Sequence, residues 1–139
     1  MPNYGATRAD WDQLSLILGL TDDLLPVVSN PKAMISPESK MKAVGKTPSR
    51  YNRRGLAAGF SDWTSHRSTN AEIDIWAAQP DYGICIQTRT VRAIDVDIED
   101  PEMASAINAD FHTLPGVIQT RNGRQKQFTT ALTGGIVRY

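Results

Sequence analysis

The sequence predicts an α/β (α+β) fold, in which helices flank a sheet, and this prediction has two sources. Apolar residues recur at helical spacing near the N-terminus and after residue 70, whereas several short apolar runs between turn residues are typical of strands. The chain has 139 residues, of which 40% are hydrophobic and 22% charged, and these values are ordinary for one globular domain. We therefore expect a single domain over residues 1–139.

The chain begins with a predicted helix and a predicted strand. Residues 9–20 carry apolar side chains on one helical face, and Gly19 is a plausible end for that helix. The members of that face are Trp11, Leu14, Ile17 and Leu18. Residues 24–28 form a short apolar run typical of a strand, and Pro26 places it at a sheet edge or at a strand start.

Residues 29–55 differ in composition from the rest of the chain. They contain few large apolar residues, so we expect a long basic loop or a mobile arm. Their charged residues are Lys32, Lys40, Lys42, Lys46, Arg50, Arg53 and Arg54, against Glu38 alone. The tail from residue 119 is also basic, whereas residues 94–110 are acidic. This distribution suits a polyanion site with a metal ion at its centre, although a mixed solubilising surface explains it too.

The next predicted elements are a helix and a hairpin. Thr69 or Asn70 is expected to cap a helix that buries Ile73 and Trp76. Strands at 84–88 and 91–98, joined by a tight turn, are expected to pair as a hairpin. The single cysteine, Cys85, excludes an internal disulfide and is expected to be a buried structural thiol.

The C-terminal third predicts one helix and a second hairpin. Asp100 is expected to cap a helix that has Pro101 in its first position and ends near residue 112. Strands at 117–121 and 127–132 are expected to pair through an Asn122-Gly123 turn.

Two aspartates carry the clearest chemical signal. Asp95 and Asp97 are two residues apart in a predicted strand, so their side chains would project from one face. A divalent cation relieves the repulsion between two such carboxylates, and oxygen ligands suit Mg²⁺ or Mn²⁺. The residues therefore predict a metal site that handles phosphates. Acidic side chains that merely face water remain the alternative interpretation.

Other motifs exclude some functions. Residues 44–47 end like a phosphate-binding loop, but Lys40 stands where the first glycine is required and Pro48 follows at once. No run of about 18 apolar residues and no signal-peptide pattern occurs, so we expect a soluble, cytoplasmic protein with no membrane partner.

Taken in order, these segments resemble the N-terminal primase-polymerase domain of phage and plasmid replication proteins, in the archaeo-eukaryotic primase superfamily. The resemblance covers residues 24–124. It is carried by Leu25-Pro26-Val27, Gly45-Lys46-Thr47-Pro48, Trp63, the 69–76 helix, Asp81-Tyr82-Gly83-Ile84, Ala93-Ile94-Asp95-Val96-Asp97, Leu114-Pro115 and Thr120-Arg121-Asn122-Gly123.

The resemblance implies an RRM-like antiparallel or mixed sheet and a nucleotidyltransferase of the DNA primase and polymerase type. It implies that Asp95 and Asp97 are the catalytic residues and bind Mg²⁺ or Mn²⁺. Template and nucleotide would be bound by Lys46, Arg50, Arg121, Arg124 and Lys126. The implied partners are single-stranded DNA, nucleotide triphosphates and a replicative helicase, in a bacterial host or from a phage.

The chain departs from the family at two motifs. The family's Ser/Thr/Gly-x-His is replaced by Arg121-Asn122-Gly123-Arg124, and no acidic residue follows Asp110 to supply the last acidic motif. The chain is then a fragment, or a truncated or degenerate module that binds nucleic acid or a replication partner without catalysis. A fragment of this kind leaves room for an oligomer that completes the sheet. A nucleotide-sugar transferase or a Toprim-type enzyme is a third, less favoured class.

Overall fold

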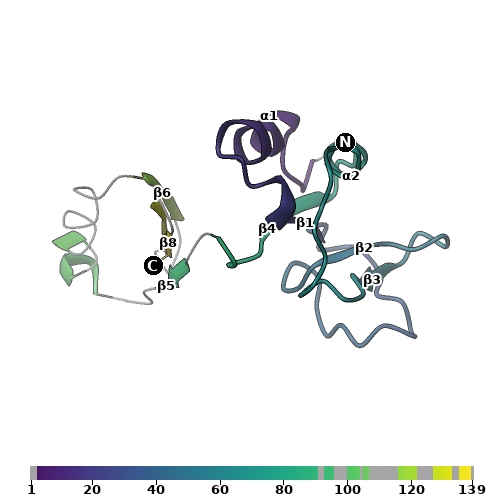
Figure 1. The fold of residues 1–139 in the computed structure, drawn as a ribbon. Coiled ribbons are helices and arrows are strands. Elements are labelled where there is room, and N and C mark those ends of the chain that lie inside the picture. Colours follow the sequence, from purple (N-terminus) through teal and green to yellow (C-terminus); the bar gives the residue numbers. More distant parts are fainter. Residues whose placement is uncertain are drawn as a thin grey trace. The chain divides into compact units, whose positions relative to one another are not determined.

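The computed structural model describes residues 3–90, 93–95, 100–103, 105–106, 116–121, 127–132 and 135–138. The chain divides into two compact units, Met1–Gln87 and Thr88–Tyr139. Both combine short helices with small sheets, as the predicted α+β class requires (Figure 1). No helix of the described residues is long and apolar enough to cross a membrane.

The first unit begins with the predicted N-terminal helix. It consists of α1 (Arg8–Asp12) and a π-helical turn η1 (Gln13–Ile17), and a separate 3₁₀ turn η2 (Thr21–Asp23) follows after Gly19. Thr7 caps α1 in a capping box with Asp10. Gly19 adopts a φ of 66°, which favours glycine, and the helix ends before it as predicted.

The predicted strand 24–28 is confirmed as β1 (Leu24–Val28), which pairs antiparallel with β4 (Tyr82–Ile86). The outer edge of β1 is closed by side chains. The Ser49 hydroxyl accepts the N–H of Val28 at 2.9 Å, and the Ser68 hydroxyl donates to the carbonyl of Leu24 at 2.5 Å. Because Pro26 has no N–H between them, this edge offers little to a further strand.

The outer edge of β4 is different. The N–H of Ser29 donates to the carbonyl of Asp81, and the N–H of Gln87 donates to the carbonyl of Asp23. These two bonds show which opposing residues of β1 and β4 are hydrogen-bonded pairs. Ile84 and Ile86 are the residues between these pairs, so their backbone groups point away from β1. Within the part of the chain that the structure describes, no backbone hydrogen bond reaches them on that edge.

The predicted hairpin between residues 84–88 and 91–98 is not among the strand pairs of the described residues. β4 pairs with β1, and β5 (Ala93–Asp95) pairs in parallel with β8 (Gly135–Arg138). Alternating apolar residues and a short connection indicate two strands, but they do not determine which strands pair. Cys85 on β4 is also half-buried, not fully buried as predicted.

The basic segment 29–55 is more ordered than predicted. It contains β2 (Ser49–Tyr51), which pairs antiparallel with β3 (Ala57–Gly59). The N–H of Ser36 and the carbonyl of Met34 both bond to Ala57, so the long loop also runs along β3. The residues of β2 are Ser, Arg and Tyr, which is why the apolar pattern missed this strand.

The predicted helix after Thr69 is confirmed as α2 (Asn70–Ala77), with Thr69 and Glu72 in a capping box. It packs over the sheet with α1 and closes the core. The rings of Trp11 and Trp76 lie 6.3 Å apart at its centre. The other fully or nearly buried apolar residues are Leu20, Leu24, Leu25, Val28, Ala57, Phe60, Ile73 and Tyr82.

The second unit contains a four-stranded mixed sheet of order β5-β8-β7-β6. β6 (Gly116–Arg121) pairs antiparallel with β7 (Gln127–Leu132), which confirms the second predicted hairpin, and its turn lies outside the described residues. Residues 101–103 and 105–106 are helical. The Asp100 carboxylate accepts the N–H of Glu102 at 2.9 Å, as expected of a cap.

Candidate functional site

An open groove of about 690 Å³ lies in the first unit. Its walls come from the long loop, from β3 and from the turn that follows β3. The lining residues are Ser36, Glu38, Ser39, Lys40, Met41, Thr47, Pro48, Asn52, Ala58, Gly59, Phe60, Ser61 and Trp63. The volume falls within the range of about 300–1,000 Å³ that is usual for small-molecule sites.

Hydrogen bonds hold the loop over β3. The Ser39 hydroxyl accepts the N–H of Met41 at 3.2 Å and the N–H of Gly59 at 3.3 Å. The carbonyl of Pro48 accepts the N–H of Phe60 at 2.9 Å. A Cβ atom on Gly59 would lie 3.8 Å from Met41 Cγ, in ordinary contact. A side chain at position 59 would therefore fit without a clash, and its absence leaves that space open in the groove.

Two aromatic rings of the groove have different surroundings. Phe60 is 7% exposed, and the Arg50 guanidinium lies 4.9 Å from its ring centroid. The rings of His66 and Trp76 meet Phe60 edge-on at 4.9 and 5.9 Å. Trp63 is 40% exposed, and no ring or cation–π contact to it occurs among the described residues.

The turn that carries Trp63 is fixed by its own backbone. Asp62 has a φ of 52°, in the left-handed region, which aspartate tolerates better than most residues. Its carbonyl accepts the N–H groups of Ser65 and His66, each at 3.1 Å. Trp63 therefore belongs to a turn with a hydrogen-bonded backbone, and it lines the groove.

One carboxylate of the groove is already bound. Glu38 accepts hydrogen bonds from the Ser36 hydroxyl at 2.5 Å and from Arg54 at 2.7 and 2.8 Å. The Ser36 bond first, and then Arg54, lower the pKa of Glu38 from its ordinary value of 4.5 to about 2. Glu38 is thus ionised at neutral pH, and it neutralises the charge of Arg54.

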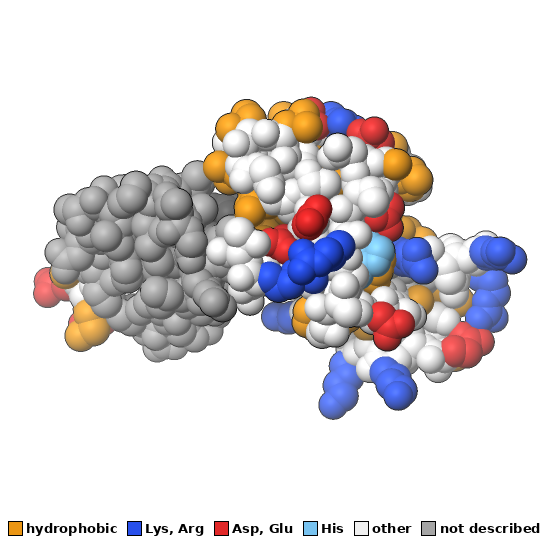
Figure 2. All heavy atoms as spheres, in the orientation of Figure 1, with side chains coloured by type: hydrophobic (Ala, Val, Ile, Leu, Met, Phe, Trp, Pro, Cys, Tyr) orange, Lys and Arg blue, Asp and Glu red, His pale blue; other side chains and the backbone are white. Residues whose placement is uncertain are grey.

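The remaining cations of the loop have no such partner. Besides Lys32 and the Arg50 that covers Phe60, these are Lys40, Lys42, Lys46 and Arg53, which are exposed and form no ion pair with a described residue. Figure 2 shows basic side chains standing out from the surface of this unit. We call these four residues the loop cations.

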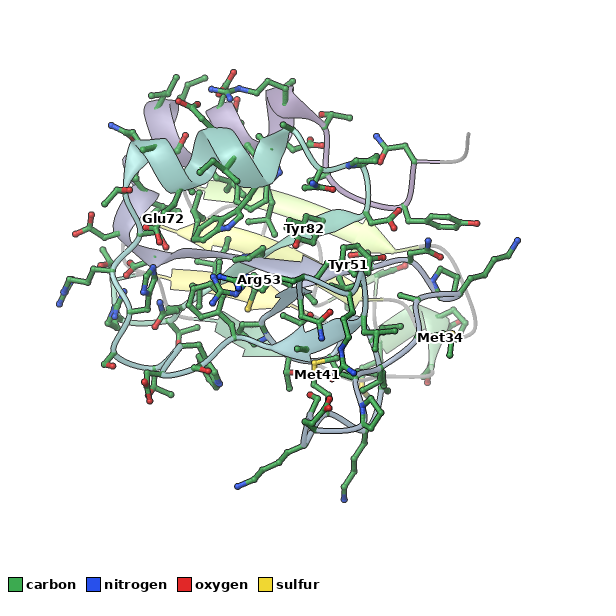
Figure 3. The ribbon with its side chains drawn as sticks, turned by 90° about the vertical axis from the view of Figure 1, so that its right-hand side faces the viewer. Met34, Met41, Tyr51, Arg53, Glu72 and Tyr82 are labelled. Atoms are coloured by element: carbon green, nitrogen blue, oxygen red, sulfur yellow. The ribbon has the colours of Figure 1, made fainter. Side chains whose placement is uncertain are left out.

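A half-buried polar cluster positions the strand that carries Arg50. The Tyr51 hydroxyl donates to Asp81 at 2.6 Å, and the Asn30 amide donates to the same carboxylate at 3.0 Å. Burial raises the pKa of Tyr51, and the bond to Asp81 raises it further. The Tyr82 hydroxyl accepts the N–H of Tyr51 at 2.8 Å, and the two rings stack (Figure 3). These contacts fix β2, and with it one wall of the groove.

The predicted site residues fall into three groups. Lys46 and Arg50 belong to the first unit and adjoin lining residues: Lys46 precedes Thr47 in the chain, and Arg50 covers the ring of Phe60. Asp95 is the last residue of β5, opposite Arg138, and Arg121 is the last residue of β6. Asp97, Arg124 and Lys126 lie outside the described residues.

The predicted metal site is not tested by these positions. Within the described ranges, no three His, Cys, Asp or Glu side chains lie close enough together to hold an ion. Asp95 and Asp97 therefore remain a prediction from the sequence.

The sequence did not single out the groove residues Lys40, Phe60 and Trp63 as a site. The available signal was the polar turn Ser61-Asp62-Trp63, because a tryptophan between polar turn residues has few apolar neighbours to bury it. Its position beside a basic loop is visible only after the chain folds.

No family model matches this chain, and no curated protein or solved structure matches it either.

Proposed function

We propose that this chain is a primase-polymerase-like domain with an RRM-like core, which binds single-stranded nucleic acid, nucleotide triphosphate and a divalent cation. The observation that best supports the proposal is the set of uncompensated loop cations beside the groove. The proposed reaction class is nucleotidyl transfer, and the proposed first substrate contact is with phosphate.

The charge argument rests on a contrast within the first unit. Arg8 bonds to Asp12 and Asp74, and Arg54 bonds to Glu38, so this chain pairs cations where acidic residues are near. Segment 29–55 provides only Glu38 against seven basic residues. A cluster of exposed, unpaired cations attracts a polyanion and releases its counterions on binding. Single-stranded nucleic acid is a polyanion of this kind, and we propose it as the ligand beside the groove.

The proposed metal ligands are Asp95 and Asp97. Asp95 belongs to a strand, and strand alternation would place Asp97 on the same face. A bound Mg²⁺ or Mn²⁺ would supply charge neutralisation for triphosphate oxygens. The two carboxylates would hold that ion, and the basic residues Arg121, Arg124 and Lys126 would add positive charge for the nucleotide.

Calorimetric titration of a deoxynucleotide triphosphate in Mn²⁺ tests the proposed nucleotide site. We expect binding to the natural chain and its loss in the Asp95→Asn/Asp97→Asn double variant. Asn is nearly isosteric with Asp, so circular dichroism of the variant should be unchanged. Equal affinity of both chains would exclude the two aspartates as the metal site.

A non-catalytic nucleic-acid-binding module is the second candidate. It is favoured by the position of the loop cations, which all belong to the first unit, whereas Asp95 belongs to the second. This candidate predicts salt-sensitive binding of single-stranded DNA that survives the loss of both aspartates. Loss of DNA binding in the double variant would exclude it.

A further inference from the structure

We propose that the groove receives one unstacked base of a single strand against Trp63, while the flanking phosphates contact Lys40 and Lys46. This inference rests on the proposed nucleic-acid binding and specifies its mode. It distinguishes recognition of a base from attraction of the phosphate backbone alone. It also assigns a binding role to Trp63, a residue outside the predicted set of catalytic and binding residues.

The exposure of Trp63 is the first step of the argument. An indole ring presents a large apolar face. Because Trp63 is 40% exposed, part of the favourable free energy of burying this side chain is not realised. Phe60, a few residues away, is covered by Arg50, His66 and Trp76. Trp63 has no comparable cover among the described residues. A stacking base would provide it, and every base has a π-face.

The form of the groove is the second step. It is open to solvent at the surface and holds about 690 Å³, which leaves room for one base. In a duplex the bases are stacked and paired, so they cannot enter such a groove without being flipped out. Bases of a single strand can be splayed and stacked on an aromatic side chain. The geometry therefore favours a single strand over a duplex.

The polar groups of the groove indicate weak preference among bases. Asn52 uses its side-chain oxygen to accept the N–H groups of Arg54 and Leu56, at 2.9 and 3.0 Å. Its side-chain N–H groups form no hydrogen bond with a described residue and can donate to a ligand. Thr47 and Ser61 add hydroxyls, which both donate and accept. Such adaptable groups, together with stacking, tolerate different bases.

The positions of the two lysines complete the argument. Lys40 lines the groove, and Lys46 immediately precedes the lining residue Thr47. Both side chains are exposed, and neither forms an ion pair with a described residue. Because Arg54 is already neutralised by Glu38, these lysines supply the charge for phosphates beside an inserted base.

The test compares two oligomers that carry the same charge. One is a short single-stranded oligothymidylate, and the other is an oligomer of the same length built from abasic units. Fluorescence anisotropy of labelled oligomers measures their affinity for the full chain. We expect the abasic oligomer to bind about tenfold to a hundredfold more weakly, the range of stacking on one aromatic residue.

Four variants assign that difference to the groove. Trp63→Ala should lower affinity for oligothymidylate by the same factor and leave the abasic oligomer unaffected, whereas Trp63→Phe should retain most of the binding. Gly59→Val places a side chain in the groove without changing charge, and it should act like Trp63→Ala. Ile75→Ala is the matched control, because Ile75 is an apolar residue of α2 with 66% exposure and does not line the groove.

The outcomes separate this inference from the proposed function. Equal affinity for both oligomers, with weaker binding of both after Lys40→Ala/Lys46→Ala, would overturn base insertion and leave nucleic-acid binding intact. Failure of both oligomers to bind at low salt would overturn the nucleic-acid function and the inference with it. Loss limited to oligothymidylate in the Trp63→Ala and Gly59→Val variants would support base insertion.

Discussion

The helical layer of the first unit, formed by α1 and α2, differs from the groove in how its cations are paired and how far its tryptophans are buried. In the helical layer, Arg8 bonds to Asp12 at 2.9 Å and to Asp74 at 2.8 Å, and Trp11 is fully buried. At the groove, the loop cations have no ion-pair partner among the described residues, and Trp63 is 40% exposed. In the helical layer, therefore, the cation is paired with carboxylates and the tryptophan ring is buried. The loop cations and Trp63 lack such ion pairs and such burial among the described residues, so we expect an external partner to contact them.

The two tryptophans provide the sharpest test of this comparison. Trp11→Ala removes a fully buried ring that packs on Trp76, so it should lower the free energy of unfolding by about 3–5 kcal/mol. Trp63→Ala removes a ring that is only partly buried, so it should lower that free energy by much less, about 1 kcal/mol. Urea denaturation followed by circular dichroism measures both values. Similar losses in the two variants would show that Trp63 is a structural residue, and the comparison would fail.

A second test concerns the hydrogen bond that joins β2 of the groove to β1 of the core. Ser49→Ala leaves the buried N–H of Val28 without its acceptor, and this should lower the free energy of unfolding by about 1–3 kcal/mol. Ser65→Ala is the control, because the Ser65 hydroxyl bonds to a carbonyl at an exposed turn. If the control is as destabilising as Ser49→Ala, burial does not determine the cost.

The smallest expected effect concerns Glu38, whose pairing with Arg54 is the exception within the basic loop. The carboxyl pKa of about 2 lies below its ordinary 4.5, so its stabilising contribution is present above pH 4.5 and is lost as pH falls toward 2. Ser36→Ala should raise this pKa most, because the Ser36 hydrogen bond is its largest cause, and Arg54→Ala should raise it less. NMR titration of the Glu38 carboxyl measures the shifts. An unchanged pKa in both variants would contradict the assigned causes.

The sequence predicted the elements whose signals are local. The Thr69 cap, the 24–28 strand and the 117–121 and 127–132 strands follow from residue patterns within a few positions, and the structure confirms them. It did not predict the partner of β4, since an apolar strand pairs with any suitable edge. It missed β2, because this strand is held by Ser49 and Tyr51 through contacts distant in sequence and not by an apolar pattern.

The candidate site was predicted in part for the same reason. Charge is visible in a sequence, so Lys46 and Arg50 were predicted as binding residues; Lys46 precedes the lining residue Thr47, and Arg50 covers the ring of the lining residue Phe60. Their binding role stays a prediction. Exposure of an aromatic ring is not visible, because it depends on which residues fold against it. Trp63 was therefore used only as part of a family resemblance and not as a site residue.

The two edges of the β1–β4 sheet differ in their ability to pair with a further strand. Two serine hydroxyls and a proline block growth beyond β1, so among the described residues β4 is the edge of this sheet that can accept another strand. The N–H of Ala6 already bonds to the carbonyl of Tyr82 at 2.9 Å, which leaves the outward backbone groups of Ile84 and Ile86 on that edge. A visiting strand would find few backbone bonds there and would owe most of its affinity to side chains, which favours one matching sequence over indiscriminate pairing.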